Sequence, residues 1–342
     1  MSEGVRELLI VGAGPAGLAV AIAARQAGLD YEVIEKGALV NSIFHFPRSQ
    51  VFFTTPELLE IGGLPFVTPY EKPTRPEALR YYRRVAETFS LEIRLGEEVV
   101  RVLRGEGGFA LETRPSRAAP QAAFEPSASR GDGPPNRTRR ARNVVLASGY
   151  YDNPNRLGIP GEDLPHVSHY YVEAHAFYGQ RVVVVGGKNS AALAALELHR
   201  NGASVTLVHR RPALSDSIKY WIRPDIENRI KEGAIGARLA TVVTEIREHD
   251  VVLQGSNGRE ELAADAVFLL TGYHPDGALL AGAGVTVDPE SCIPQHDPQT
   301  FETDVPGLFV AGSLVSGKMT NRIFIENGRF HGEAIVARIR AR

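Results

Sequence analysis

The chain of 342 residues carries a formal net charge of -2, and 43% of its residues are apolar, a composition typical of a globular protein of about two domains. This near-neutral charge excludes a general attraction to nucleic acid or to an anionic membrane, so we expect neither as a partner. The single cysteine, Cys292, excludes an intrachain disulfide, a CxxC redox pair and a thiolate metal cluster, and it suits a cytoplasmic protein without a bound metal.

The first 35 residues predict a βαβ unit, with strands at residues 7–11 and 31–35 and a helix at residues 16–27. The uncharged run at residues 8–24 is similar to a signal peptide or membrane span, but Pro15 and three glycines interrupt it. A nucleotide site explains each of these residues, and no other apolar run approaches the ~20 residues that cross a bilayer. We therefore expect a soluble protein.

The turn of this unit has the GxGxxG spacing of a dinucleotide site, formed by Gly12, Gly14 and Gly17. In such a turn the first glycine allows a tight bend, the second lets the backbone approach a pyrophosphate, and the third lets helix and strand pack closely. Glu35 ends the next strand, where a carboxylate accepts hydrogen bonds from both hydroxyls of an adenosine ribose and repels a 2′-phosphate. The sequence therefore predicts a ligand without a 2′-phosphate, such as FAD.

Residues 115–142 are rich in Pro, Ala, Ser and Arg and show no apolar periodicity. They predict a long surface loop, partly disordered, between a strand near Phe109 and a strand at residues 143–147. Its arginines are compatible with a patch for an acceptor protein or for nucleic acid. We favour a solvated insertion.

Two stretches of the sequence are similar, VVLASGYY at residues 144–151 and VFLLTGYH at residues 267–274. In each, the apolar residues of a predicted strand are followed by a small residue and a glycine. We interpret them as the two points at which the chain crosses between domains. The predicted fold is therefore α/β, with two Rossmann-like three-layer domains, the second inserted in the first. The expected domains are an FAD-binding domain at residues 1–152 and 276–342 and a second dinucleotide-binding domain at residues 153–275.

A second βαβ unit lies in the inserted domain. Its predicted elements are a strand at residues 181–185, a helix at residues 190–201 and a strand at residues 204–208. Gly186, Gly187 and Ala191 match the first fingerprint, but Lys188 stands where the middle glycine belongs. We favour a pyrophosphate that lies farther out and is reached by the Lys188 ammonium as a point charge; the alternative is a degenerate site that binds weakly.

The residue that ends the second strand distinguishes the two sites. His209 follows Gly186 by 23 residues, the same spacing that separates the first glycine and the acidic residue of the first unit. His209, Arg210 and Arg211 place cations where the first unit has a carboxylate, and arginine binds phosphate through two parallel charge-assisted bonds. The inserted domain should therefore prefer NADPH, with a solvated basic turn as the alternative reading.

Two dinucleotide domains, one inserted in the other, resemble the two-domain flavoprotein pyridine nucleotide reductases, of which thioredoxin reductase is the familiar member. The resemblance is sharper to one subgroup, the YpdA-like proteins, which are regarded as bacillithiol disulfide reductases. The GGKNSA turn with its lysine is itself a feature of that subgroup. The stretches that carry the resemblance are residues 52–84, 168–198, 269–276 and 323–335, and it covers nearly the whole chain except residues 115–142.

The resemblance implies two sets of cofactor-binding residues. The implied FAD set, with Ser42 and Thr54 near the flavin and Val99 against the adenine, is Gly12, Gly14, Pro15, Ala16, Gly17, Glu35, Lys36, Ser42, Thr54, Val99, Gly149, Gly312, Ser313 and Ile323. The implied NADPH set is Gly186, Gly187, Lys188, Asn189, Ser190, Ala191, His209, Arg210 and Arg211. Thioredoxin reductases have an aspartate at the position of Ser313, and the segment at residues 321–331 should aim a helix N-terminus at the flavin.

The chain departs from the disulfide-reducing members at Ala16. Their first fingerprint reads GGGPCG, and its cysteine is the proposed partner of the bacillithiol sulfur, whereas GAGPAG has an alanine there. Cys292 lies in a predicted loop, and nothing around it indicates thiolate activation. Catalytic side chains are therefore unknown, and the flavin itself is the reactive group.

The leading hypothesis is an NADPH-dependent flavoprotein oxidoreductase that acts on a low-molecular-weight disulfide or a related small acceptor, and we expect a homo-oligomer. Hydride transfer needs orientation rather than a side-chain acid or base, so His45, His274 and His331 are either proton donors for the reduced product or packing residues. The alternatives are a ferredoxin or flavodoxin reductase, which needs no cysteine, a flavin monooxygenase, and a nucleotide-binding redox sensor without turnover.

Overall fold

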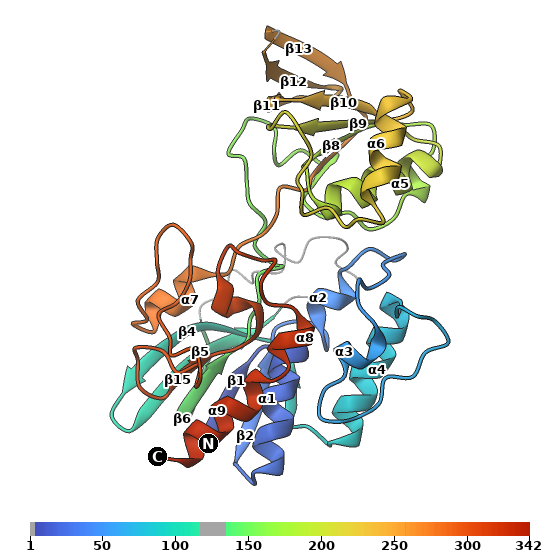
Figure 1. Cartoon of the computed structure of the whole chain (residues 1–342). Coiled ribbons are helices and arrows are strands. Elements are labelled where there is room, and N and C mark those ends of the chain that lie inside the picture. The colour runs from blue at the N-terminus through green and yellow to red at the C-terminus, as the bar shows by residue number, and fades with distance from the viewer. Residues whose placement is uncertain (1–3, 117–134, 257) are drawn as a thin grey trace. The chain divides into compact units, whose positions relative to one another are not determined.

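The computed structural model of the chain describes residues 4–116, 135–256 and 258–342. The chain divides into two compact units, Met1–Asn153 with Tyr273–Arg342 and Pro154–Gly272, so that the second unit is inserted in the first along the sequence. The first unit contains a mixed sheet and the second a parallel sheet, and helices pack on both (Figure 1). The predicted α/β fold class is therefore confirmed.

The first unit is built on a seven-stranded sheet whose central strands are buried on both faces. In β1, Leu8 and Ile10 belong to one hydrophobic core, while Leu9 and Val11 belong to another on the opposite face. Such burial explains why this strand is continuously apolar rather than alternating. In spatial order the strands are β3 (Ile93–Leu95), β2 (Tyr31–Glu35), β1 (Arg6–Val11), β6 (Arg137–Leu146), β5 (Gly108–Pro115) and β4 (Glu97–Gly105), with β15 (Leu308–Val310) beside β6.

Helices α1 (Pro15–Gln26) and α9 (His331–Arg340) lie side by side against one face of this sheet (Figure 1). They approach so closely that a Cβ at Gly332 would lie 2.6 Å from the Ala19 carbonyl oxygen. The last helix of the chain is thereby fixed to the first. The remaining helices of the unit are α2 (Asn41–Phe44), α3 (Pro56–Leu59), α4 (Arg75–Thr88), α7 (Gly277–Gly282), α8 (Ile325–Gly328) and a 3-10 helix at Gly312–Ser316.

The second unit contains a five-stranded parallel sheet and a separate three-stranded antiparallel sheet. The parallel sheet has the order β10 (Gly236–Leu239), β9 (Ser204–His209), β8 (Arg181–Val185), β14 (Ala266–Leu269) and β7 (Val167–Ser168). The antiparallel sheet consists of β11 (Val242–Ile246), β12 (Asp250–Gly255) and β13 (Gly258–Ala263). The helices are α5 (Asn189–Arg200), α6 (Arg223–Lys231) and a 3-10 helix at His175–Phe177.

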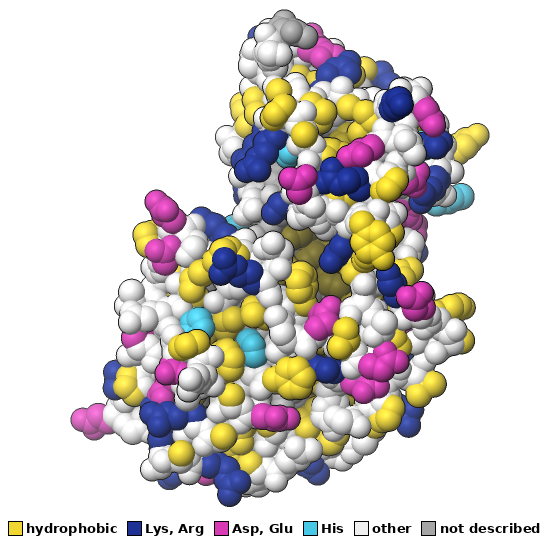
Figure 2. Space-filling view, viewed as in Figure 1, with side chains coloured by type: hydrophobic (Ala, Val, Ile, Leu, Met, Phe, Trp, Pro, Cys, Tyr) yellow, Lys and Arg dark blue, Asp and Glu magenta, His cyan; other side chains and the backbone are white. Residues whose placement is uncertain are grey.

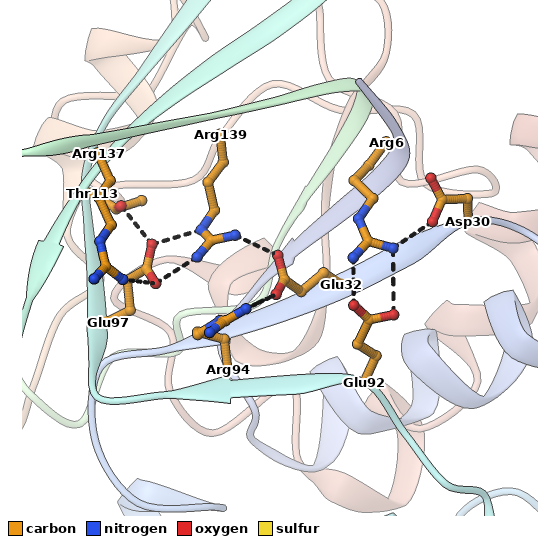
Figure 3. A network of polar contacts seen from close by, with 9 residues as sticks. All are labelled: Arg6, Asp30, Glu32, Glu92, Arg94, Glu97, Thr113, Arg137 and Arg139. Atoms are coloured by element: carbon orange, nitrogen blue, oxygen red, sulfur yellow. Dashed lines mark hydrogen bonds and ion pairs between the residues drawn. The ribbon is translucent and has the colours of Figure 1, made fainter. Parts of the chain in front are cut away.

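A buried ionic network ties the antiparallel strands of the first unit to its parallel strands (Figure 3). Arg139 of β6 is 5% exposed and pairs with Glu97 of β4 at 2.6 Å and with Glu32 of β2 at 2.9 Å. Glu97 also accepts a hydrogen bond of 2.5 Å from Thr113, and Glu32 pairs with Arg94 at 3.2 Å. One guanidinium thus joins two buried carboxylates from strands that are distant in sequence.

This network corrects the expected loop at residues 115–142. Strand β6 begins at Arg137, so the last six residues of the expected loop belong to a strand, and the strand expected at residues 143–147 is longer than predicted. Residues 117–134 of that expected loop lie outside the described residues.

The charged side chains on one face of the molecule agree with the composition (Figure 2). On the face drawn in Figure 2, basic and acidic side chains are interspersed, in line with the formal net charge of -2. Within the described residues, none of the helices has the length and apolar character required to span a membrane.

Candidate functional site

The turn between β1 and α1 has two tightly packed glycines and one that faces open space. Gly12 has a φ of +104°, and a Cβ at Gly17 would lie 1.9 Å from the Gly12 carbonyl oxygen, so neither position accepts a side chain without strain. Gly14 has a φ of -72°, and a Cβ added there meets nothing within 4 Å. Gly14 needs no special backbone angle, so glycine at this position is explained by space rather than by conformation. The lack of a side chain leaves room for a closely bound group, as a pyrophosphate requires. Pro15 follows as the first residue of α1, where its lack of an N–H costs no bond.

Glu35 holds this turn from the end of β2. Its Oε2 accepts a hydrogen bond of 2.8 Å from the Ala13 N–H, and its Oε1 accepts one of 2.7 Å from the Gly37 N–H. The Val40 N–H donates to the Ala13 carbonyl at 3.1 Å, so the Ala13 residue is held at both its N–H and its C=O. Burial raises the pKa of Glu35, and the two backbone bonds offset part of that effect. Each carboxylate oxygen keeps a second lone pair, which fits the hydroxyls of a ribose.

The next residue, Lys36, forms an ion pair of 2.6 Å with Oδ2 of Asp152, a residue that lies just before the chain leaves the first unit. The other oxygen, Oδ1 of Asp152, is buried and makes no hydrogen bond within the described part of the chain. A buried acceptor without a donor is costly, and a hydroxyl of a bound ligand would satisfy it. Asp152 is a candidate site residue that reasoning from the sequence did not find.

Segments far apart in the sequence meet behind the glycine turn. A Cβ at Gly312, where φ is +67°, would lie 2.7 Å from the Cβ of Ala16, and a Cβ at Gly149 would lie 3.8 Å from Oγ of Ser313. The structure therefore brings together four of the residues that the family resemblance assigns to FAD.

His331 is buried beneath this cluster. Its Nδ1 accepts a hydrogen bond of 3.2 Å from the Gly312 N–H, and its ring stacks on Phe301 with 3.9 Å between centroids. Burial lowers the pKa of His331 to about 4, and His296 contributes to the lowering. A neutral, buried ring that already accepts a bond fits the packing role and not the proton-donor role. Burial also lowers the pKa of His45, the second histidine considered as a proton donor.

The other residues of the implied FAD set are spread over the unit. Ser42 lies in α2, Thr54 precedes α3, and Val99 of β4 packs against the hydrophobic core that contains Leu9 and Val11. Ile323 lies next to Gly328, 3.3 Å from the position of an added Cβ there. Two helices begin within residues 321–331, the four-residue α8 at Ile325 and α9 at His331, and the helix N-terminus expected to face the flavin stays a prediction.

The second glycine turn, between β8 and α5, repeats the first with a lysine in the middle. A Cβ at Gly186, where φ is +156°, would lie 2.6 Å from the Leu270 carbonyl oxygen and 2.8 Å from the Cβ of Ala191. Lys188 is the N-cap of α5, as Gly14 is of α1, and its φ of -118° and ψ of -169° are extended angles that any residue adopts. The exposed lysine therefore fits the turn without strain.

His209 occupies the same position relative to the second turn as Glu35 does to the first. A Cβ at Gly187 would lie 2.2 Å from the His209 ring, so the ring covers this glycine. Burial, followed by the charges of Arg210 and Arg211, lowers the pKa of His209, so that the ring is neutral near pH 7. Arg210 and Arg211, which follow His209, are exposed.

Asn189 holds a loop across the second turn. Its Oδ1 accepts a hydrogen bond of 2.9 Å from the Lys219 N–H, and its Nδ2 donates one of 3.1 Å to the Ser217 carbonyl. The Ser215 N–H also donates to the Gly187 carbonyl at 2.9 Å. Ser190, the next residue of the implied set, is exposed. The Asn189 side chain therefore positions the loop rather than presenting free polar atoms to a ligand.

Comparisons with known proteins agree with this geometry. The family model described as pyridine nucleotide-disulphide oxidoreductase matches residues 9–121 and 135–312. Bacilliredoxin reductase Bdr of Bacillus subtilis (strain 168) is 42% identical over 98% of this chain and 97% of its own length.

Two solved structures are similar throughout. The bacillithiol disulfide reductase Bdr (YpdA) of Bacillus cereus has a TM-score of 0.92 and 39% identity, and that of Staphylococcus aureus has a TM-score of 0.90 and 35% identity. In both cases 99% of this chain and 99% of the other are covered. The chain is therefore a flavoprotein oxidoreductase with FAD and NADPH as cofactors, and it belongs to the pyridine nucleotide-disulphide oxidoreductase family.

Proposed function

We propose that the chain reduces a low-molecular-weight disulfide of the bacillithiol disulfide type with electrons from NADPH. The observation that carries the proposal is the 42% identity with bacilliredoxin reductase Bdr along 98% of the chain. Bound FAD would supply the two-electron chemistry between nicotinamide and disulfide, and the overall reaction would convert NADPH, a proton and a disulfide into NADP⁺ and two thiols.

The chain's own residues supply binding and orientation. In this proposal the first unit binds FAD, with the pyrophosphate at the open side of Gly14 and the ribose at Glu35. The buried Oδ1 of Asp152 accepts a hydrogen bond from a hydroxyl of the same ligand. The second unit binds NADPH at the turn of Lys188, with Arg210 and Arg211 as the phosphate-binding cations. The remaining residues of the two implied sets belong to the same two sites.

We further propose that the disulfide is reduced without a protein thiol. The position of the family cysteine holds Ala16, whose methyl group faces Gly312. The one cysteine of the sequence, Cys292, lies in a loop whose backbone packs against Gly317. Replacing Cys292 by serine gives a protein with no thiol at all, which makes the proposal directly testable.

The experiment is a two-step anaerobic reaction with the wild type and with Cys292→Ser. Each protein, loaded with FAD, is reduced with NADPH and then mixed with bacillithiol disulfide, while the oxidised flavin absorbance band is followed. We expect the band to return equally fast in both proteins, with two thiols formed per NADPH. Recovery only with ferredoxin or flavodoxin would reject disulfide reduction and support the electron-transfer alternative. Recovery in the wild type alone would reject the thiol-free route.

We also propose that the acceptor is used in a reducing compartment such as the cytoplasm, since a chain with one cysteine gains nothing from oxidising conditions. We also propose that the protein is a homo-oligomer. Light scattering on the purified protein tests it, and a mass of one chain would contradict it.

A further inference from the structure

A pocket of about 250 Å³ lies beside α4 in the first unit, and none of the residues around it belongs to the two glycine turns. One wall is a proline-rich loop at residues 65–69, and the other is the face of α4 that carries Tyr81 and two arginines, Arg80 and Arg84. The chemistry proposed above gives this pocket no role.

The loop of the pocket is fixed in place before any partner arrives. The Phe66 ring stacks on Tyr81 with 4.3 Å between centroids and 3° between planes. The Tyr81 hydroxyl donates to the Leu64 carbonyl at 2.8 Å and accepts from the Ile61 N–H at 2.9 Å, and the Phe66 N–H donates to Glu60 at 2.9 Å. The conformational entropy lost when a partner binds to this loop is therefore small.

The pocket carries an excess of positive charge. Arg80 and Arg84 are one helical turn apart and exposed, and like charges at this spacing repel each other. The Glu77 carboxylate also lines the pocket and interacts electrostatically with Arg80, but no ion pair within the described residues holds either arginine. In contrast, Arg83 on the same helix pairs with Glu87 at 4.0 Å. An added carboxylate between the two lining arginines would relieve their repulsion.

The rim of the pocket is apolar and unusually exposed. Val67 is 86% exposed, although its neighbour Phe66 is buried and the loop is held on both sides. Pockets that enclose a small molecule have volumes of about 300–1,000 Å³. A smaller open pocket with an apolar rim fits one or two inserted side chains of a larger partner better than a whole small molecule.

We propose that this pocket is a docking site for an acidic segment of a partner protein. A glutamate or aspartate of the segment lies between Arg80 and Arg84, and an adjacent apolar side chain packs on Val67 and Phe66. Charge and size together favour this occupant, because a pocket of about 250 Å³ with two arginines suits one carboxylate and one apolar side chain, whereas an RNA strand needs several cations along its row of phosphates.

The test uses the full chain with FAD bound and two fluorescein-labelled peptides, Ac-Glu-Leu-Glu-Leu-Glu and its Gln-Leu-Gln-Leu-Gln counterpart. In fluorescence anisotropy we expect the acidic peptide to bind roughly tenfold more tightly than the neutral one, and to weaken as salt is raised. The double variant Arg80→Glu/Arg84→Glu should lose this binding, while the matched control Arg83→Glu retains it within about twofold. Val67→Asp should weaken both peptides.

Several outcomes would overturn the proposal. Equal binding of the two peptides, or equal loss in the Arg83→Glu control, would show that the pocket does not recognise the acidic segment. Competition by citrate at the concentration at which the peptide binds would assign the pocket to a small carboxylate instead. Reduction of the flavin by NADPH should be unchanged in every variant, so a failure of docking is distinguishable from a failure of the proposed reductase function.

Discussion

Removing the Arg139 guanidinium should destabilise the first unit strongly, and Arg139→Met is the substitution that does so while keeping most of the buried side-chain volume. Breaking a buried ion pair by removing one partner costs about 3–5 kcal/mol, because it leaves an uncompensated buried charge. Here two carboxylates lose a partner, but Glu97 keeps Thr113 at 2.5 Å and Arg137 at 3.7 Å, and Glu32 keeps Arg94 at 3.2 Å. We therefore expect a loss of about 3–4 kcal/mol, a large share of the ~5–15 kcal/mol of a typical domain.

The loss should depend on pH in a definite direction. Burial raises the pKa of Glu97, but its bonds to Arg139 and Thr113 bring the net pKa below the usual value. The stabilisation is therefore present above the pKa of about 4.5 of an unfolded glutamate and is lost as the pH falls below it. Without Arg139, burial dominates and raises the pKa of Glu97. The difference in the free energy of unfolding between wild type and variant should therefore become smaller as the pH falls from 7 towards 4.

The assay is urea unfolding followed by circular dichroism, with hydrogen exchange of peptides from β4, β5 and β6 to assign the loss to this sheet. Arg94→Met is the control, because that side chain is 47% exposed and its pair should contribute less than about 1 kcal/mol. Adding Glu32→Gln and Glu97→Gln to Arg139→Met should recover part of the loss. A loss no larger than that of the control would refute the reasoning from buried charge.

Three further predictions concern the two sites. Burial lowers the pKa of His331 to about 4, so acidification from pH 6.5 to 4 should destabilise the wild type by about 3 kcal/mol through protonation of this group in the unfolded state. The urea concentration at the unfolding midpoint should therefore change less with pH in His331→Phe than in the wild type. Arg210→Ala with Arg211→Ala should raise the KM for NADPH at least about tenfold more than that for NADH; equal effects in steady-state kinetics would remove the 2′-phosphate assignment. Gly187→Ala places a Cβ 2.2 Å from the ring of His209, so NADPH titration should show weaker binding, whereas FAD fluorescence titration should be unchanged.

The βαβ units were predictable because their signal is local. An apolar run followed by spaced glycines fixes a strand, a turn and a helix within one stretch of chain, and the strands expected at residues 31–35 and 181–185 have those bounds in the structure. The shared spacing to Glu35 and His209 was equally visible, and both side chains do contact the turn of their own unit.

Contacts between distant segments were not predictable from such patterns. Buried and exposed residues alternate in the first half of β6, and its buried residues there are Arg139 and Ala141. Because neither is strongly apolar, the sequence shows no strand pattern, and Arg139 was assigned to a solvated loop. Its burial depends on carboxylates that are 42 and 107 residues away. The bond between His331 and Gly312 and the unpaired oxygen of Asp152 likewise depend on three-dimensional packing alone.

The two bonds that hold Ala13 bear on how the protein is loaded with its cofactor. Because Glu35 and Val40 hold both polar groups of this residue, hydrogen bonds within the chain fix the conformation of the turn. A preorganised binding site loses little conformational entropy when its ligand binds. The conformation of this turn therefore depends on contacts within the chain, so the binding of FAD need not spend energy on ordering it.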